Sequence, residues 1–340
     1  MIAQCVIFPE ANRVDIRTEE VPAPGPGQVL TRTLYSLISA GTELTLLGGG
    51  HPPGSFWDSY GCYPVSPGFG QVAEVVAVGP GVPGLAPGDR VLSSQGHRSA
   101  SLVGADRLRT LPGEIFPEEA VFHSIAAGVI SAIRLGRLAL GDAVAVVGLG
   151  LLGQFAVRLA RLAGARPVIG VDLAAERRDL ALAGGATAAL APQVTDVRAE
   201  VARLTRERLA DVVFEMTGNP EAIPLALQLA RPQGRYVQVG CPRGKSELDF
   251  NDSVLVPGLH IVGALFAQQP VEETAGSPRT RQRNVELFLD LLGDGELEVA
   301  SLLTHRFPWR EAPAAYATLQ HDGAGAMGVL LDWTESGAGA

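Results

Sequence analysis

Residues 143–162, AVAVVGLGLLGQFAVRLARL, contain the most informative pattern of the chain. The short apolar run Ala143–Val147 is typical of a buried strand. Three glycines follow it at once, and then comes an apolar stretch with helical periodicity. A strand, a glycine turn and a helix in this order indicate the first unit of a parallel sheet that is covered by helices.

The alternation of strand and helix continues beyond this first unit. Helical stretches separate further short runs rich in β-branched residues, which is the pattern of a parallel sheet. The predicted strands are Ala143–Val147, Pro167–Val171, Ala186–Leu190, Asp211–Glu215, Tyr236–Gly240 and Ile261–Leu265. Strands in this number and order predict an α/β, doubly wound dinucleotide-binding (Rossmann) domain.

The glycine turn predicts where a dinucleotide binds. Gly148 permits the tight turn, Gly150 lets the backbone approach a pyrophosphate, and Gly153 lets helix and strand pack closely. Leu151 and Leu152 begin the helix, whose positive N-terminus holds an anion. The context of strand, turn and helix makes this motif far more specific than the three glycines alone.

An acidic residue at the end of the second strand predicts which dinucleotide binds. Asp172 can accept hydrogen bonds from the adenine-ribose hydroxyls and would repel a 2′-phosphate, which favours NAD(H) over NADP(H). Arg177 can lie against the adenine. Thr217 and Gly240, at the carboxyl ends of the fourth and fifth strands, complete the predicted cofactor contacts. The alternative is that Asp172 only caps the following helix.

The first hundred or so residues have a different rhythm, in which short β-like runs alternate with Gly/Pro clusters. These clusters are APGPGQ at 23–28, GGGHPPG at 48–54 and GPGVPGLAPGD at 79–89. The valine-rich run Val72–Val78 between two glycines is short enough for a buried strand. This part of the chain is therefore expected to form a small β-barrel.

Length and composition limit the kinds of function. A chain of 340 residues with 46% hydrophobic and 19% charged residues has enough apolar surface for two globular domains. A net charge of −9 without a basic run argues against nucleic acid or a membrane surface as a partner and favours a small-molecule substrate. No leader or membrane-spanning segment is evident, so the cytoplasm is the expected location.

The cysteines exclude two structural devices. Cys5, Cys62 and Cys241 lie far apart in the chain without paired spacing. This distribution excludes a disulfide framework and a structural zinc lobe held by four cysteines.

Several segments in order resemble the medium-chain dehydrogenase/reductase family over nearly the whole chain. They are PAPGPGQVL at 22–30, SAGTEL at 39–44, PGFGQVAEVVAVGPGV at 67–82, PGDRV at 87–91, DVVFEMTGNPEAI at 211–223 and RPQGRYVQVG at 231–240. The resemblance implies a GroES-like catalytic domain at 1–123, the Rossmann domain at 124–266 and a return to the catalytic domain at 267–340. It also implies a cleft where nicotinamide meets substrate, and a homodimer or homotetramer formed through Ile261–Leu265.

The chain departs from the family pattern at the zinc ligands. Ala40 stands where zinc-dependent members carry a cysteine, and Phe69 stands where they carry a histidine. Gly70 replaces the carboxylate beside it, and the third ligand falls near His123. One histidine cannot hold Zn²⁺, so we predict neither catalytic nor structural zinc. A substitute site lacks the short ligand spacing that such sites use; its candidates are His51, Cys62, His97 and His123.

Without a metal, side chains must take the alcohol proton during hydride transfer. The resemblance places Thr42 at the position that contacts the substrate hydroxyl, unless its own hydroxyl bonds to a turn. His123 is a candidate base or a satisfied core residue. His97 borders the substrate in the family or is a solvated loop residue. Glu43 has lost its family partner, so it is a base, an arginine partner or solvated.

Aromatic residues near these positions suggest a substrate wall. Phe69, Tyr63 and Trp57, together with Phe56, would suit a planar or apolar substrate. Packing in the core of the barrel is the alternative.

Three functions remain open on the sequence. The first is a zinc-independent NAD(H)-dependent oxidoreductase acting on a secondary alcohol or carbonyl, such as a polyol, a sugar or a specialised metabolite. The second is an NADPH-dependent quinone or enone reductase, against which Asp172 argues. The third is a dinucleotide-binding protein without catalytic activity.

Overall fold

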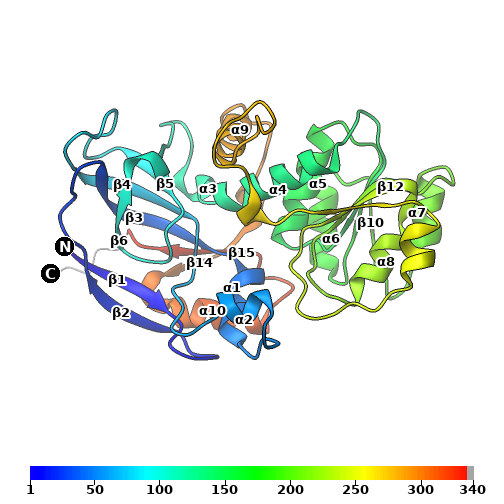
Figure 1. Ribbon diagram of the computed structural model, residues 1–340, viewed down its shortest axis with the longest axis horizontal. Coiled ribbons are helices and arrows are strands. Elements are labelled where there is room, and N and C mark those ends of the chain that lie inside the picture. Colours follow the sequence, from blue (N-terminus) through cyan, green and yellow to red (C-terminus); the bar gives the residue numbers. More distant parts are fainter. Residues whose placement is uncertain (335–340) are drawn as a thin grey trace. The chain divides into compact units, whose positions relative to one another are not determined.

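The computed structural model describes residues 1–334, and its contacts divide the chain into two units. Unit 1 comprises Met1–Ile125 and the segment from Val299 onward, and unit 2 comprises Ala126–Glu298 (Figure 1). The sequence placed the return to the first domain at residue 267, and the structure places it at 299. The reason is the packing of helix α9 (Arg281–Gly293), in which Phe288 lies 6.3 Å from Phe155 between ring centroids.

Unit 2 contains one parallel sheet of six strands in the order β10-β9-β8-β11-β12-β13. This order, with the first strand at the centre, is that of a Rossmann fold. All predicted strands are present, and only the fifth begins well before its predicted start. The strands are β8 (Val144–Val147), β9 (Val168–Val171), β10 (Ala188–Leu190), β11 (Ala210–Glu215), β12 (Ala230–Gln238) and β13 (His260–Gly263).

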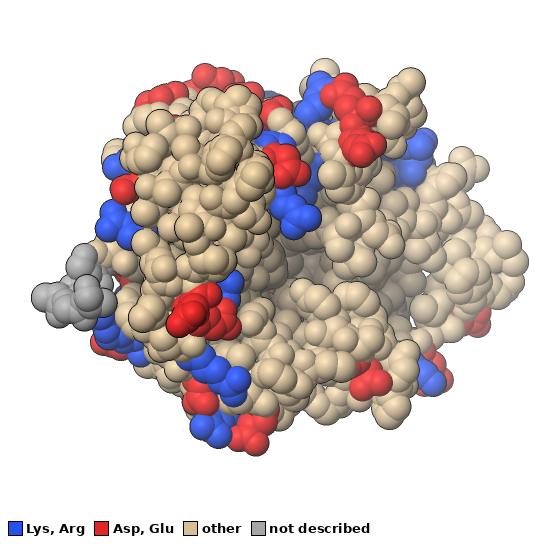
Figure 2. All heavy atoms as spheres, turned by 60° about the vertical axis from the view of Figure 1, so that its left-hand side comes forward, with Lys and Arg blue, Asp and Glu red and all other residues tan. Residues whose placement is uncertain are grey.

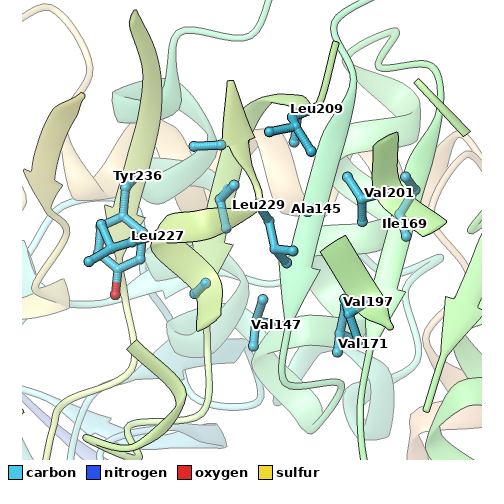
Figure 3. Packing of buried hydrophobic residues seen from close by; sticks show 14 of the residues in the cluster. Ala145, Val147, Ile169, Val171, Val197, Val201, Leu209, Leu227, Leu229 and Tyr236 are labelled. Carbon is cyan, nitrogen blue, oxygen red and sulfur yellow. The ribbon is translucent and has the colours of Figure 1, made fainter. Parts of the chain in front are cut away.

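Helices cover both faces of this sheet, which is why its strands are apolar on both sides. Side chains such as Val147, Ile169 and Val171 form one apolar core with Val197 and Leu227 of the helices α7 and α8 (Figure 3). On the opposite face, a Cβ at Gly136 of α4 would lie 2.7 Å from the ring of Phe214. The helices are α4 (His123–Gly136), α5 (Leu151–Leu162), α6 (Ala175–Ala183), α7 (Val197–Leu204), α8 (Ala222–Gln228) and α9.

Unit 1 is built on a seven-stranded sheet in the order β14-β15-β3-β4-β5-β7, with β6 paired to β3. The valine-rich run predicted as a strand is β4 (Gln71–Val78). The other strands of this sheet are β3 (Gln28–Ile38), β5 (Arg90–Ser93), β6 (Ala100–Gly104), β7 (Arg109–Thr110), β14 (Leu303–Pro308) and β15 (Gly328–Asp332). Because β15 pairs antiparallel with β3, the end of the chain joins the first part of the unit.

A hairpin of β1 (Ile2–Ile7) and β2 (Asp15–Glu20) and several short helices complete unit 1. Helices α1 and α2 lie beside α10 at one side of this unit (Figure 1). The helices are α1 (Ala40–Gly48), α2 (Phe56–Tyr60), α3 (Pro117–Ala120) and α10 (Ala312–His321). The segments that the sequence assigned to the active site therefore meet the returning chain.

Two surface properties bear on possible partners. None of the helices within residues 1–334 is both long and apolar enough to cross a bilayer. On the face seen in Figure 2, Lys and Arg side chains are scattered among Asp and Glu, without a continuous basic area.

Candidate functional site

The glycine turn after β8 has the geometry of an anion cradle. Gly148 has a φ of 91°, and its N–H donates to the Val171 carbonyl over 2.8 Å. Gly150 is the N-cap of α5 and offers no side-chain cap to the first N–H groups of the helix. A Cβ at Gly153 would overlap the Gly148 carbonyl oxygen. The first N–H groups of α5 are therefore left without a side-chain cap at a turn built of glycines, which is the arrangement that binds a pyrophosphate at a helix N-terminus.

Asp172 is bonded directly to this turn. Its Oδ2 accepts a hydrogen bond from the Leu149 N–H over 2.7 Å, and its Oδ1 accepts one from the Ala174 N–H over 2.9 Å. The N-cap of α6 is Ala174, so Asp172 does not occupy the capping position of that helix. Each carboxylate oxygen has a further lone pair, which leaves two sites for ribose hydroxyls.

Arg177 lies on the same side of the turn. Its Nη1 is 3.9 Å from Asp172 Oδ2 and 3.8 Å from where a Cβ at Gly150 would stand. Gln154 fastens this region, because its Nε2 donates to the carbonyls of Leu149 and Arg177 over 2.9 and 2.8 Å. Sequence reasoning missed Leu173, an apolar side chain that directly follows Asp172 and is 66% exposed. The guanidinium and this exposed side chain offer surfaces for an adenine ring.

Glu215, at the end of β11, organises the neighbouring turn and was not predicted. Its buried carboxylate accepts hydrogen bonds from the Thr217 N–H over 2.8 Å, the Thr217 hydroxyl, the Gly218 N–H and the Gln238 amide over 2.6 Å. These donors stabilise a carboxylate that has no basic partner among the described residues. A charged residue that ends the apolar run VVFE was the available signal.

Thr217 lies close to the glycine turn, and Gly240 lies close to the turn at Gly218 that follows β11. A Cβ at Gly148 would lie 2.6 Å from Thr217 Cγ2, and a Cβ at Gly240 would overlap the Gly218 nitrogen. The Thr217 hydroxyl donates to Glu215. Its oxygen already accepts a hydrogen bond from the Asn219 N–H over 2.9 Å, so it offers a bound cofactor one remaining lone pair as an acceptor.

Thr42 lies in the first turn of α1 and is half-buried. Its hydroxyl makes no hydrogen bond to another residue within 1–334, which argues against the local turn bond considered for it. Thr45 makes a bond of that kind instead, to the Gly41 carbonyl over 2.6 Å. The Thr42 hydroxyl is thus available to a substrate.

Glu43 and His97 form a buried pair. Glu43 Oε2 lies 2.9 Å from His97 Nε2, and both side chains are at most 1% exposed. The suggestions of a solvated glutamate and a solvated loop histidine were therefore wrong, and the partner of Glu43 is not an arginine. The physical reason is Gly68, where the lack of a side chain lets the imidazole lie against the backbone; a Cβ there would be 2.9 Å from the ring.

His123 is the first residue of α4 and is 3% exposed. It belongs to unit 1, as do Thr42, Glu43 and His97. Its burial agrees with either a core residue or a base in a closed site, so its catalytic role stays a prediction.

The residues present do not fit the family's catalytic zinc. Neither Ala40 nor Phe69 carries a side-chain donor atom, and both nitrogens of His97 are already engaged with Glu43 and Ser36. No group of three His, Cys, Asp or Glu side chains placed to hold a metal occurs in the described part of the chain.

The aromatic residues predicted to form a substrate wall differ in their exposure. Trp57 is buried, which agrees with the alternative of core packing, and the half-buried Tyr63 donates its hydroxyl to the Leu46 carbonyl over 2.7 Å. Phe69 is half-buried. Phe56 and Tyr60 of α2 are stacked at 5.3 Å and are about half exposed, which makes them the accessible aromatic surface. Burial, and then the charge of Glu43, raise the pKa of Tyr60.

Comparison with known proteins identifies the family. The sequence model of a protein family described as "Zinc-binding dehydrogenase" matches residues 152–277. D-guloside 3-dehydrogenase of Escherichia coli K12 is 32% identical over 256 residues, which cover 72% of this chain and 71% of that protein. The chain belongs to the zinc-type medium-chain dehydrogenase/reductase family.

Other members support this assignment over a greater length. L-Threonine 3-dehydrogenase of Pyrococcus furiosus is 28% identical over 323 residues, 85% of this chain and 86% of that one. The alcohol dehydrogenase TADH from Thermus sp. ATN1 superposes with a TM-score of 0.78 at 26% identity, covering 97% of this chain and 99% of that chain. This medium-chain dehydrogenase/reductase thus has the Rossmann and GroES-like domains of its family without the usual ligand atoms at 40 and 69.

Proposed function

We propose that this family member is an NAD(H)-dependent oxidoreductase that works without zinc. It transfers a hydride between nicotinamide and a secondary alcohol or its carbonyl product. The observation that carries the cofactor assignment is the Asp172 carboxylate, which is hydrogen-bonded to the glycine turn and keeps lone pairs for ribose hydroxyls. Two relatives are named as dehydrogenases of guloside and of threonine, which supports an alcohol substrate.

The cofactor, when bound, supplies nicotinamide C4 as hydride acceptor or donor. The turn at Gly148–Gly153 holds its pyrophosphate, and Asp172 holds the adenine ribose. Thr42 accepts the hydrogen bond of the substrate hydroxyl and relays its proton by donating its own hydroxyl hydrogen onward to solvent, since that hydroxyl has no competing bond within 1–334. His123 is the second candidate for the proton.

The set of side-chain donor atoms supports the proposed independence from zinc. A catalytic zinc site needs three protein ligands, and residues 40 and 69 supply none. The exposed pair Phe56 and Tyr60 offers an apolar face to the substrate. We propose a polyol, a sugar or a specialised metabolite as the substrate class.

We also propose that the chain forms a homodimer or homotetramer through β13. This strand is the edge of the Rossmann sheet, and Ile261 within it is 49% exposed. Leu255 and Val256 nearby in sequence are 69% and 73% exposed. An apolar edge strand of this kind favours pairing with a second chain. Three free cysteines agree with the reducing cytoplasm as the location.

Cofactor preference is the first test of this proposal. By fluorescence titration, wild-type protein should bind NADH at least about tenfold more tightly than NADPH. Asp172→Ala should weaken NADH binding by about 10- to 100-fold, because hydrogen bonds to a carboxylate are lost, and should largely remove the preference.

Asp196→Ala is the matched control, because Asp196 also accepts a backbone N–H in unit 2, as the N-cap of α7. It should leave the NADH/NADPH affinity ratio unchanged. An unaltered ratio in Asp172→Ala, or a wild-type preference for NADPH, would contradict the assignment.

A further inference from the structure

A buried chain of hydrogen bonds in unit 1 joins residues that lie far apart in the sequence. Trp333 Nε1 donates to Ser36 Oγ over 2.8 Å, and Ser36 Oγ lies 2.8 Å from His97 Nδ1. The chain continues from His97 Nε2 to Glu43 over 2.9 Å, and the Tyr316 hydroxyl donates to the same Glu43 oxygen over 2.5 Å. All these side chains are buried, so water does not compete for the bonds.

One arrangement of protons satisfies every group in this chain. An indole N–H only donates, so Ser36 accepts from Trp333 and is free to donate its own hydrogen to His97 Nδ1. His97 Nε2–H and the Tyr316 hydroxyl then both donate to Glu43 Oε2. Burial and the nearby Glu43 raise the pKa of Tyr316 well above its usual value, so the phenol remains a donor. His97 uses both nitrogens inside the network and has none left for a substrate.

The network ends on the helix that carries Thr42. Glu43 Oε1 accepts a hydrogen bond from the Ser39 N–H over 2.7 Å, at the N-cap of α1. Glu43 therefore ties the first turn of α1 to the loop of His97 and, through Tyr316, to α10. Thr42 is its immediate neighbour in that turn. A displacement of this turn by about 1 Å would move the Thr42 hydroxyl enough to cost up to about 10²-fold in rate.

We propose that Tyr316, Glu43 and His97 form a clamp that positions Thr42 for proton removal, and that this clamp fixes the site in place of a metal. His97 provides the imidazole that Glu43 would otherwise lack, because residue 69 is Phe. Tyr316 is thereby a positioning residue contributed by the last segment of the chain. This inference rests on the proposed function, in which Thr42 acts on the substrate hydroxyl.

A double-mutant cycle with Thr42 tests the clamp. Tyr316→Phe keeps the ring, which packs edge-on against Phe8 at 5.1 Å, and removes only the hydroxyl. It should lower kcat with a secondary alcohol by about tenfold and leave the NADH dissociation constant unchanged. In a Thr42→Ala background the same substitution should lower kcat by less than about twofold, because a positioning residue has nothing left to position.

Tyr35→Phe is the matched control, since its buried ring also loses one hydroxyl bond, to Arg306 Nη2 at 3.0 Å. It should retain wild-type kcat. His97→Gln provides a second variant with the same expected non-additivity. Equal effects of Tyr316→Phe in both backgrounds, or no effect in either, would overturn the clamp. Absence of turnover in the wild-type protein would instead count against the proposed function.

Discussion

Gly153→Ala is expected to abolish NADH binding, with at least a 100-fold rise in the dissociation constant. The added methyl group would overlap the Gly148 carbonyl oxygen, so α5 must move away from the turn that receives the pyrophosphate. Overpacking of this kind also costs about 1–3 kcal/mol of folding free energy. Fluorescence titration with NADH and the thermal unfolding midpoint measure the two effects.

Substitutions at two other glycines distinguish an effect on NADH binding from an effect on folding stability. In Gly150→Ala the added methyl group makes only an ordinary van der Waals contact, with Arg177 Nη1 at 3.8 Å, so the unfolding midpoint should match the wild type. It should still weaken NADH binding, because its methyl group stands where the pyrophosphate approaches the backbone. Gly293→Ala, with nothing within 4 Å, should change neither property. Wild-type NADH affinity in Gly153→Ala would show that the dinucleotide binds elsewhere.

Thr42→Ala is expected to lower kcat by about 10²- to 10⁴-fold, the range that positioned proton transfer contributes. Cofactor binding should remain intact, because the glycine turn and Asp172 belong to unit 2 and Thr42 belongs to unit 1. Steady-state kinetics with a secondary alcohol, together with NADH titration of the same preparation, measures both quantities.

Thr42→Ser is the control for this substitution, because it keeps the hydroxyl at the same position in the first turn of α1. It should retain turnover within about tenfold of the wild type. If Thr42→Ala turned over at the wild-type rate, the proton would have to leave by another group, and His123 would become the first candidate.

Much of the fold could be predicted because short local sequence patterns specify its strands, turns and helices. The runs around β8, β9 and β11 are short, apolar and β-branched, and each is followed by a turn and a helix. The glycine motif was predicted for the same reason, since all of its constraints act within a few residues. The return to the first domain was placed wrongly, because α9 is amphipathic and its sequence does not say against which unit Phe288 packs.

The sequence named residues of the candidate active site but did not predict which of them contact one another. Glu43 and His97 were both named, yet 54 positions separate them, and Tyr316 is 273 positions from Glu43. No spacing rule joins such residues. The pairing of β15 with β3 returns the last segment to unit 1, where α10 packs against α1. Glu215 was missed for a related reason. Its carboxylate accepts hydrogen bonds both from the turn after β11 and from Gln238 of β12.

The loss of the ligand atoms has a consistent consequence in this structure. Where zinc-dependent members would need ligand atoms at 40 and 69, this chain has Ala40 and Phe69, and Glu43 is bonded to an imidazole from another loop. The two imidazole nitrogens and the carboxylate therefore all take part in hydrogen bonds within unit 1.

NAD-dependent hydride transfer without a metal can be tested in a single assay. Protein treated with a strong zinc chelator and then dialysed should be assayed with NAD⁺ and a panel of secondary alcohols, with the zinc content measured in the same sample. We expect the full rate of the untreated protein at a zinc content far below one ion per chain. Loss of the rate on chelation, and its return on addition of Zn²⁺, would show that the enzyme depends on zinc.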